Sequence, residues 1–162
     1  MNNNKYIFIL VIILILITAK PISANSESDL VLNLSDKKGE IIFEQEVDIG
    51  KEFIVSFIHS SELEPWHNIF EVGKNKEIVL KKILVPSTGP GVPSVLPEDE
   101  NWSFRITNGY FIYSNVNKKY EDLDFIVSDI SPHYLIINGE GINLVELTKD
   151  WAHINFKIRR KR

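Results

Sequence analysis

Short apolar runs divided by turn residues are the feature that most limits what this chain can fold into. From Leu30 onward a turn signal recurs about every 8 to 12 residues, and apolar and polar side chains alternate between the turns. A period of two is typical of strands, because neighbouring side chains on a strand point to opposite faces. No stretch of this region shows the longer period of a helix. The pattern predicts an all-β fold, an antiparallel β-sandwich or partly closed barrel of about ten short strands.

Turn chemistry indicates which of these strands pair. Residues 73–76 and 138–141 each separate two apolar runs, and Asn108-Gly109 is a strong signal for a tight hairpin. The run at 52–59 is apolar on both faces, which predicts a strand at the centre of its sheet. Residues 148–151 are expected to form at most a short helical turn. The predicted strands are residues 30–34, 40–44, 52–59, 68–72, 77–85, 102–107, 110–116, 123–127, 134–137, 142–147 and 152–158.

The amino-terminal residues have the pattern of a targeting segment. Lys5 precedes an apolar run at 6–19, and Ile22 and Ala24 occupy two positions that a signal peptidase reads. We predict that residues 1–24 are a signal peptide or, if uncut, an N-terminal membrane anchor, although the run is short for a span of roughly 20 residues. Residues 25–162 then form a single β domain with a basic C-terminal tail. Its expected location is extracytoplasmic: secreted, or held at the outer face of the cytoplasmic membrane or in the periplasm.

Cysteine content and charge exclude several classes of function. The chain has no cysteine, which rules out disulfides, a lipoprotein anchor, a thiol nucleophile and a thiolate zinc site. Its net charge is −4, and five of its basic side chains stand in the last six residues. An acidic body of this kind does not bind nucleic acid through a broad basic face. The basic run at 157–162 is either a solvated terminus or a contact for anionic phospholipid or cell-wall polymer.

The densest group of functional side chains lies in the predicted turn after the central strand. Imidazole and carboxylate groups of such a turn are able to converge on a ligand, with a serine hydroxyl and an indole ring beside them. The same residue types also describe a purely structural hairpin mouth. A third alternative is a metal site of His59, His67 and Glu64 or Glu62, although the spacing matches no standard zinc signature. The candidate ligand-binding residues of this turn are His59, Ser60, Glu62, Glu64, Trp66 and His67.

A second candidate segment is the loop rich in proline and glycine that follows residue 86. Gly89 and Gly91 bracket Pro90, so the backbone there has room to approach a ligand and to offer it amide groups. A rigid surface crossover is the alternative interpretation. We expect this loop and the turn at 59–67 to meet at one end of the sandwich, where such folds place their binding surfaces.

The sequence gives little support to catalysis. His59 and Ser60 are adjacent on a strand and point to opposite faces, so His59 is poorly placed to act as the base for Ser60. There is no Gly-x-Ser-x-Gly motif. We therefore predict a protein that is not an enzyme and has no cofactor.

Other aromatic residues and histidines have structural alternatives. The tryptophans Trp66, Trp102 and Trp151 stand at strand starts or turns, where they either line a pocket or cap the core. His133 is expected to be partly buried with a backbone partner, and His153 to face solvent.

Several short motifs together resemble a known family. They are His59-Ser60, Pro65-Trp66 with Phe70, the Gly-x-Gly-x-Pro pattern of Gly89, Gly91 and Pro93, and His133-Tyr134-Leu135 before Gly139. This set is similar to an uncharacterised bacterial exported family, a domain of unknown function often encoded beside the permease of tripartite TRAP-type (TAXI) transporters. Pro90 and Val92 depart from the family's loop pattern. The resemblance implies an accessory role in solute uptake and brings no catalytic residue with it.

The leading hypothesis is therefore an exported, non-catalytic binding or accessory module. Its expected partners are a transporter permease or a small anionic solute, together with the membrane if the amino-terminal segment is not cut. The alternatives are a metal-binding protein or metal-dependent hydrolase that uses the histidine–glutamate set, and a purely structural envelope protein.

Overall fold

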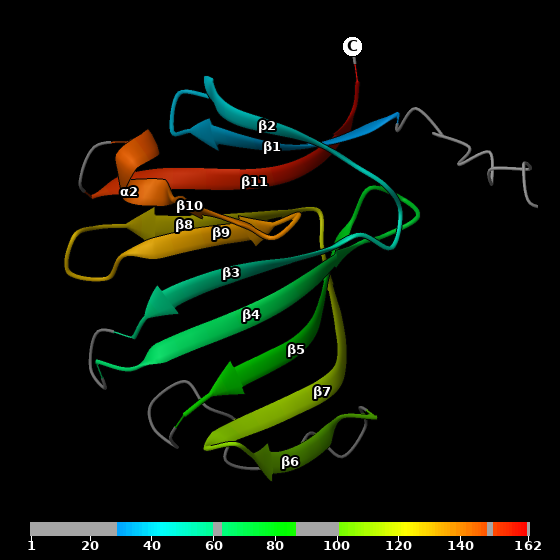
Figure 1. The fold of residues 1–162 in the computed structure, drawn as a ribbon. Coiled ribbons are helices and arrows are strands. Elements are labelled where there is room, and N and C mark those ends of the chain that lie inside the picture. The colour runs from blue at the N-terminus through cyan, green and yellow to red at the C-terminus, as the bar shows by residue number, and fades with distance from the viewer. Residues whose placement is uncertain (1–28, 60–62, 87–100, 149–150, 162) are drawn as a thin grey trace, which may run out of the picture.

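The fold consists of two packed antiparallel sheets, and the all-β prediction is confirmed (Figure 1). The computed structural model describes residues 29–59, 63–86, 101–148 and 151–161. The smaller sheet has the strand order β2 (Ile41–Val47), β1 (Leu30–Asp36), β11 (Ala152–Arg160), β8 (Asp122–Val127). The larger sheet has the order β10 (Glu140–Asn143), β9 (His133–Ile137), β3 (Glu52–Ile58), β4 (Pro65–Val72), β5 (Ile78–Val85), β7 (Tyr110–Tyr120), β6 (Ser103–Thr107).

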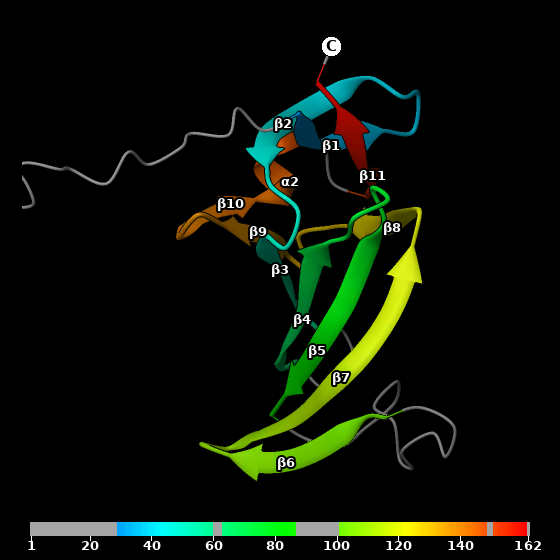
Figure 2. The same cartoon turned by 90° about the vertical axis from the view of Figure 1, so that its right-hand side faces the viewer.

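The core lies between the inner faces of the two sheets. Alternate side chains of β1 and β11, such as Leu32, Leu34 and Phe156, are fully buried and face those of the larger sheet. Phe53 and Val55 of β3 are equally buried, and β3 lies between β9 and β4 as expected for a central strand. Figure 2 shows β5, β7 and β6 curving away from the smaller sheet.

The predicted turns close most of the hairpins. Asn108 and Gly109 adopt φ values of 50° and 79°, the left-handed geometry of a tight turn between β6 and β7. The turn at 73–77 joins β4 to β5. These residues adopt positive φ at little cost, which explains why sequence alone located the turns.

The strand predicted at 142–147 and the helical turn predicted at 148–151 are both misplaced. Residues 142–147 do not continue as a strand, because β10 ends at Asn143 and a one-turn helix, α2 (Leu144–Leu147), follows. The Asn143 side chain accepts from the Val145 amide at 3.1 Å and donates to Glu146 at 3.0 Å. The Asn143 side chain thus caps a helical turn, although the apolar pattern of residues 142–147 is typical of a strand. The helical turn therefore precedes the predicted one at 148–151, of which residues 149 and 150 lie outside the described part.

Antiparallel pairing sorts the described connections into two ends of the sandwich. We call one the rim end; it carries the connections at 37–40, 59–64, 108–109 and 128–132. We call the other the basic end; it carries the connections at 48–51, 73–77, 121 and 138–139. In Figure 1 the rim end is on the left and the basic end on the right.

The amino-terminal segment at 1–24 lies outside the described residues, so its predicted role stays a prediction. Among the residues that are described, no helix is long and apolar enough to cross a membrane.

Candidate functional site

The topology brings the starting points of both candidate segments to the rim end. Phe57 of β3 pairs with Trp66 of β4, and His67 of β4 pairs with Leu84 of β5. The turn after β3 and the loop after β5 therefore leave the larger sheet at the same end. The predicted site residues Ser60, Glu62, Gly89 and Gly91 lie outside the described residues, so the meeting of the two segments stays a prediction.

Backbone hydrogen bonds close the hairpin between β3 and β4. The His59 amide donates to the Glu64 carbonyl at 2.9 Å, and the Leu63 amide donates to the His59 carbonyl at 2.8 Å. Leu63 adopts a left-handed φ of 54°, and its side chain is 72% exposed. The hairpin thus holds an apolar side chain out into solvent at its tip.

A row of stacked rings runs from this hairpin into the core. The ring centroids of His59 and Trp66 are 5.4 Å apart, and those of Trp66 and Phe57 are 5.9 Å apart. Phe57 stacks on His133 at 4.9 Å, and His133 contacts Phe125 of the smaller sheet at 5.7 Å. The row therefore joins the two sheets at the rim end.

The indole of Trp66 is already engaged by the fold. Its Nε1 donates to the Asn68 carboxamide at 2.9 Å, and the ring packs against the core. The core-capping interpretation therefore describes Trp66, and it also describes Trp102, which packs edge-on against Tyr113. Contact of a ligand with the remaining surface of Trp66 stays a prediction.

His133 is a buried histidine with a backbone partner, as predicted. Its Nδ1 lies 2.7 Å from the Ser131 carbonyl, which only accepts, so Nδ1 carries the proton. Burial lowers the pKa of His133, and the hydrogen bond to Ser131 opposes this only in part. His133 is thus a neutral ring near neutral pH.

His67 lies on the other face of the larger sheet. It follows Trp66 on β4, contacts Tyr110 at 5.9 Å, and has its pKa lowered by burial. His59 stacks on Trp66, so the two imidazoles are on different faces. Within the described residues no group of three His, Asp or Glu side chains is placed to hold a metal ion. The set His59, His67 and Glu64 therefore does not form such a site, and a ligand role for Glu62 stays a prediction.

One carboxylate oxygen of Glu64 has no hydrogen-bond donor among the described residues. This oxygen, Oε2, is buried. The hydroxyl of Ser131 donates to the Ile58 carbonyl at 2.6 Å, which fixes the connection at 128–132 against the end of β3. Ile130 in this connection is 65% exposed. The connections at the rim end thus present two exposed apolar side chains, Leu63 and Ile130. Glu64, next to Leu63 in the chain, has a buried carboxylate oxygen without a donor among the described residues.

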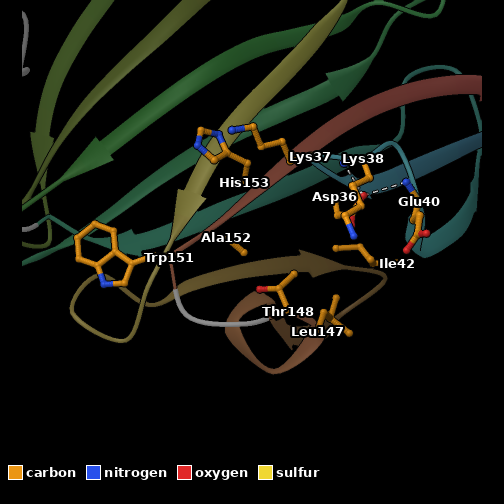
Figure 3. Close-up of a pocket in the computed structure, with 10 residues that line it drawn as sticks. All are labelled: Asp36, Lys37, Lys38, Glu40, Ile42, Leu147, Thr148, Trp151, Ala152 and His153. Atoms are coloured by element: carbon orange, nitrogen blue, oxygen red, sulfur yellow. Dashed lines mark hydrogen bonds between the residues drawn. The ribbon is translucent and has the colours of Figure 1, made fainter.

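The rim end also holds an open hollow that the sequence did not predict. Its volume is about 940 Å³, and it lies between the β1–β2 turn and the start of β11 (Figure 3). The lining residues are Asp36, Lys37, Lys38, Glu40, Ile42, Leu147, Thr148, Trp151, Ala152 and His153.

The walls of this hollow differ in chemistry. Figure 3 shows Lys37 reaching toward His153, and both side chains also line a smaller adjoining hollow of about 340 Å³. Trp151, at the start of β11, is 64% exposed. Asp36 is tied into its turn, since its Oδ1 accepts from the Lys38 and Glu40 amides at 2.8 and 2.9 Å.

One prediction about these residues is confirmed, because His153 faces solvent. The pairing of Asp36 with Ile154 brings together segments more than a hundred residues apart. The one sequence feature that pointed to this hollow was Trp151, a large aromatic residue directly before a predicted strand.

Comparison with known proteins gives one match. A family model described as "Domain of unknown function (DUF1850)" matches residues 53–144, which is more than half of the chain. The chain belongs to the DUF1850 family. The resemblance to an uncharacterised family is thereby confirmed, whereas its association with transporters stays a prediction. No curated protein and no solved structure matches the chain.

The DUF1850 segment covers the two candidate sites unequally. It begins at Phe53 in β3 and ends at Leu144, the first residue of α2. The hairpin at 59–64 and His133 lie inside it. All residues that line the larger hollow lie outside it, in β1, β2, α2, β11 and the connections between them.

Proposed function

We propose that the protein is an exported, non-catalytic binding module that holds a small carboxylate-bearing solute at its rim end and assists a solute transporter. The hollow beside Lys37, Trp151 and His153 carries this proposal. A volume of about 940 Å³ lies in the usual range for small-molecule sites. The transporter role comes from the resemblance to a family encoded beside TRAP-type permeases.

The chemistry of the lining supports an amphipathic carboxylate. Ile42, Leu147 and Ala152 are half-buried and pack against the core, which gives the hollow an apolar base. The ammonium of Lys37 and the ring of His153 stand where a carboxylate would find donors. The exposed indole of Trp151 offers a face for the apolar part of the solute.

Calorimetric titration of the purified protein tests the solute site. The probes are 4-methylpentanoate, benzoate and glutamate, each paired with its neutral amide or, for glutamate, its diamide. We expect at least one carboxylate to bind while its amide does not. Lys37→Gln and Trp151→Ala should each weaken that binding about tenfold, as expected for loss of one charge-assisted hydrogen bond or one aromatic contact.

The matched control is Lys118→Gln, an exposed lysine at the basic end. It removes the same charge and should leave the affinity unchanged. Equal affinity for acid and amide, or equal loss in Lys37→Gln and Lys118→Gln, would reject the solute site.

The rim suits a second role, contact with a transporter protein. Leu63 and Ile130 are exposed on two connections of the rim end, and the buried Glu64 oxygen next to Leu63 has no partner among the described residues. This combination of apolar surface and buried acceptor suits a protein loop with an N–H donor. Glu64→Ala with Leu63→Ser should then abolish capture of a neighbouring permease in cross-linking, while Lys81→Gln should not. Capture that survives the double substitution would reject this role.

A further inference from the structure

The two chain ends leave the domain side by side at the basic end. Leu30, the first residue of β1, pairs with Arg160, the last residue of β11. The Lys161 amide donates to the Asp29 carbonyl at 2.7 Å. The basic run that ends the chain therefore lies where the chain enters the fold, as Figure 1 shows on its right-hand side.

This corner is continuous with two turns of the same end. Leu30 also pairs with Val47, from which the connection at 48–51 passes to the larger sheet. There the Val72 amide donates to the Lys51 carbonyl at 3.0 Å, and the turn at 73–77 follows. Hydrogen bonds thus link the corner of Arg160, Lys51 and the turn at 73–77 into one surface.

Cations collect on this surface. Lys74, Lys76, Lys118 and Arg160 are exposed, Lys51 is half-exposed, and none of them has an ion pair within the described residues. Several acids of this end are neutralised by other lysines: Glu77 by Lys119 at 3.3 Å, Asp122 by Lys157 at 3.5 Å, and Glu46 by Lys161. Glu52 and Glu71, where β3 begins and β4 ends, lie 3.9 Å from Lys82 and Lys81. The acids of this end without such an ion pair in the described part of the chain are Asp29, Asp48, Glu121 and Glu140.

The rim end has the opposite balance. Its described cations are Lys37, Lys38 and Arg105, and its described acids are Asp36, Glu40, Glu64, Asp129 and Glu146. A protein with a net charge of −4 thus has a cationic pole, and that pole is the end at which its amino-terminal segment joins the fold.

We infer that the basic end is a docking surface for an anionic phospholipid bilayer, and that it turns the rim end away from the membrane. Charge complementarity supports this occupant, because each Lys or Arg near an anionic bilayer contributes up to about 1 kcal/mol of attraction. The sequence supports it too. The apolar run at 6–19 precedes Asp29 by a short segment with a reach of roughly 30 Å, so the bilayer it would enter lies within reach of these lysines.

The absence of cysteine allows a direct test, since one introduced cysteine is the only label site. The complete chain would carry a fluorophore at Asn75→Cys in the basic turn or, as control, at Ile130→Cys at the rim. Each is mixed with vesicles that contain phosphatidylglycerol or phosphatidylcholine alone, with a spin-labelled headgroup lipid as quencher. We expect the Asn75 label to be quenched about threefold more than the Ile130 label on anionic vesicles, and the difference to shrink with added salt.

Substitution of the lysines tests whether their charge causes the difference in quenching between the two labels. Lys74→Gln, Lys76→Gln and Lys118→Gln combined should remove the difference between the labels. Lys37→Gln, Lys38→Gln and Arg105→Gln combined change the net charge equally and should leave it intact. Thermal unfolding of both triple variants shows whether they remain folded.

Three results would overturn the inference. The first is equal quenching of the two labels, and the second is stronger quenching at Ile130. The third is binding of soluble polyphosphate by the basic end without any contact with vesicles, which would assign the surface to a soluble polyanion. None of these results bears on the hollow, so the inference stands or falls independently of the proposed solute.

Discussion

The rim end and the basic end share a buried apolar core but differ in the side chains near their surfaces. At the rim, stacked rings from His59 to Phe125 join the two sheets, and half-buried groups such as Trp66 and His67 sit near the surface. At the basic end, apolar side chains such as Phe53, Phe70 and Val72 are buried in the core, and exposed ion pairs such as Lys157–Asp122 lie on the surface. Stacked and buried groups stabilise a fold, whereas solvated charges contribute little.

This difference separates stability from function at the two ends. Substitutions in the ring row should disturb the fold first and any binding only as a consequence. Substitutions of the lysines at the basic end should leave the fold intact, so that their effects report on a partner. The orientation inferred for the basic end also directs the rim toward the aqueous phase, where a small solute would reach the hollow.

The largest effect is expected from Phe57→Ala. The ring of Phe57 stacks on both Trp66 and His133, so its removal opens a cavity in the row that joins the sheets. We expect a loss of about 3 kcal/mol in the free energy of unfolding, measured by urea denaturation.

Leu63→Ala is the control for Phe57→Ala, because Leu63 is at the same end but 72% exposed. It should change stability by less than about 0.5 kcal/mol. Similar losses for the two variants would show that the ring row does not hold the rim together.

Acidification should destabilise the rim end through its buried histidines. Burial lowers the pKa of His133 below its ordinary value of 6.5. As the pH falls below 6.5, the unfolded chain therefore binds a proton at this residue before the folded chain does. The stability present above pH 6.5 is therefore lost as the pH falls below that value. His67 contributes in the same direction.

Melting temperatures at neutral and mildly acidic pH test this effect. The drop on acidification should be smaller in His133→Phe than in the unsubstituted protein. His153→Gln, which replaces an exposed histidine, should keep the full drop. An undiminished drop in His133→Phe would assign the acid sensitivity to other groups.

The smallest effect is expected at the basic end. Lys157→Gln removes the 3.5 Å pair with Asp122, in which both side chains are more than a third exposed. We expect a change in unfolding free energy of less than about 0.5 kcal/mol, which vanishes at high salt. A loss as large as that of Phe57→Ala would remove the contrast between the two ends.

The fold was predictable where local chemistry decides it. Asn108-Gly109 and the turn at 73–77 determine which strands pair, and the apolar run at 52–59 indicated the central strand β3. The end of β10 was not predictable from the apolar pattern, because the side chain of Asn143 starts a helical turn. Trp66 likewise lies within β4 although its polar neighbours suggested a turn.

The candidate site was predictable only in part. Sequence located the hairpin that carries His59 and Trp66, but their stacking depends on the register between β3 and β4. The hollow depends on the pairing of β1 with β11, a contact between the two ends of the domain that no local pattern reports. The burial of His133 was predicted, but its contact with Phe125 of the smaller sheet depends on packing across the two sheets.

Hydrogen–deuterium exchange of the complete chain tests the division between the two ends most directly. The exchange of residues 36–43 and 73–77 would be compared in the presence of the bound carboxylate and, separately, of phosphatidylglycerol vesicles. We predict that the carboxylate slows exchange only at 36–43 and that the vesicles slow it only at 73–77. Protection of 36–43 by the vesicles, or of 73–77 by the carboxylate, would contradict it.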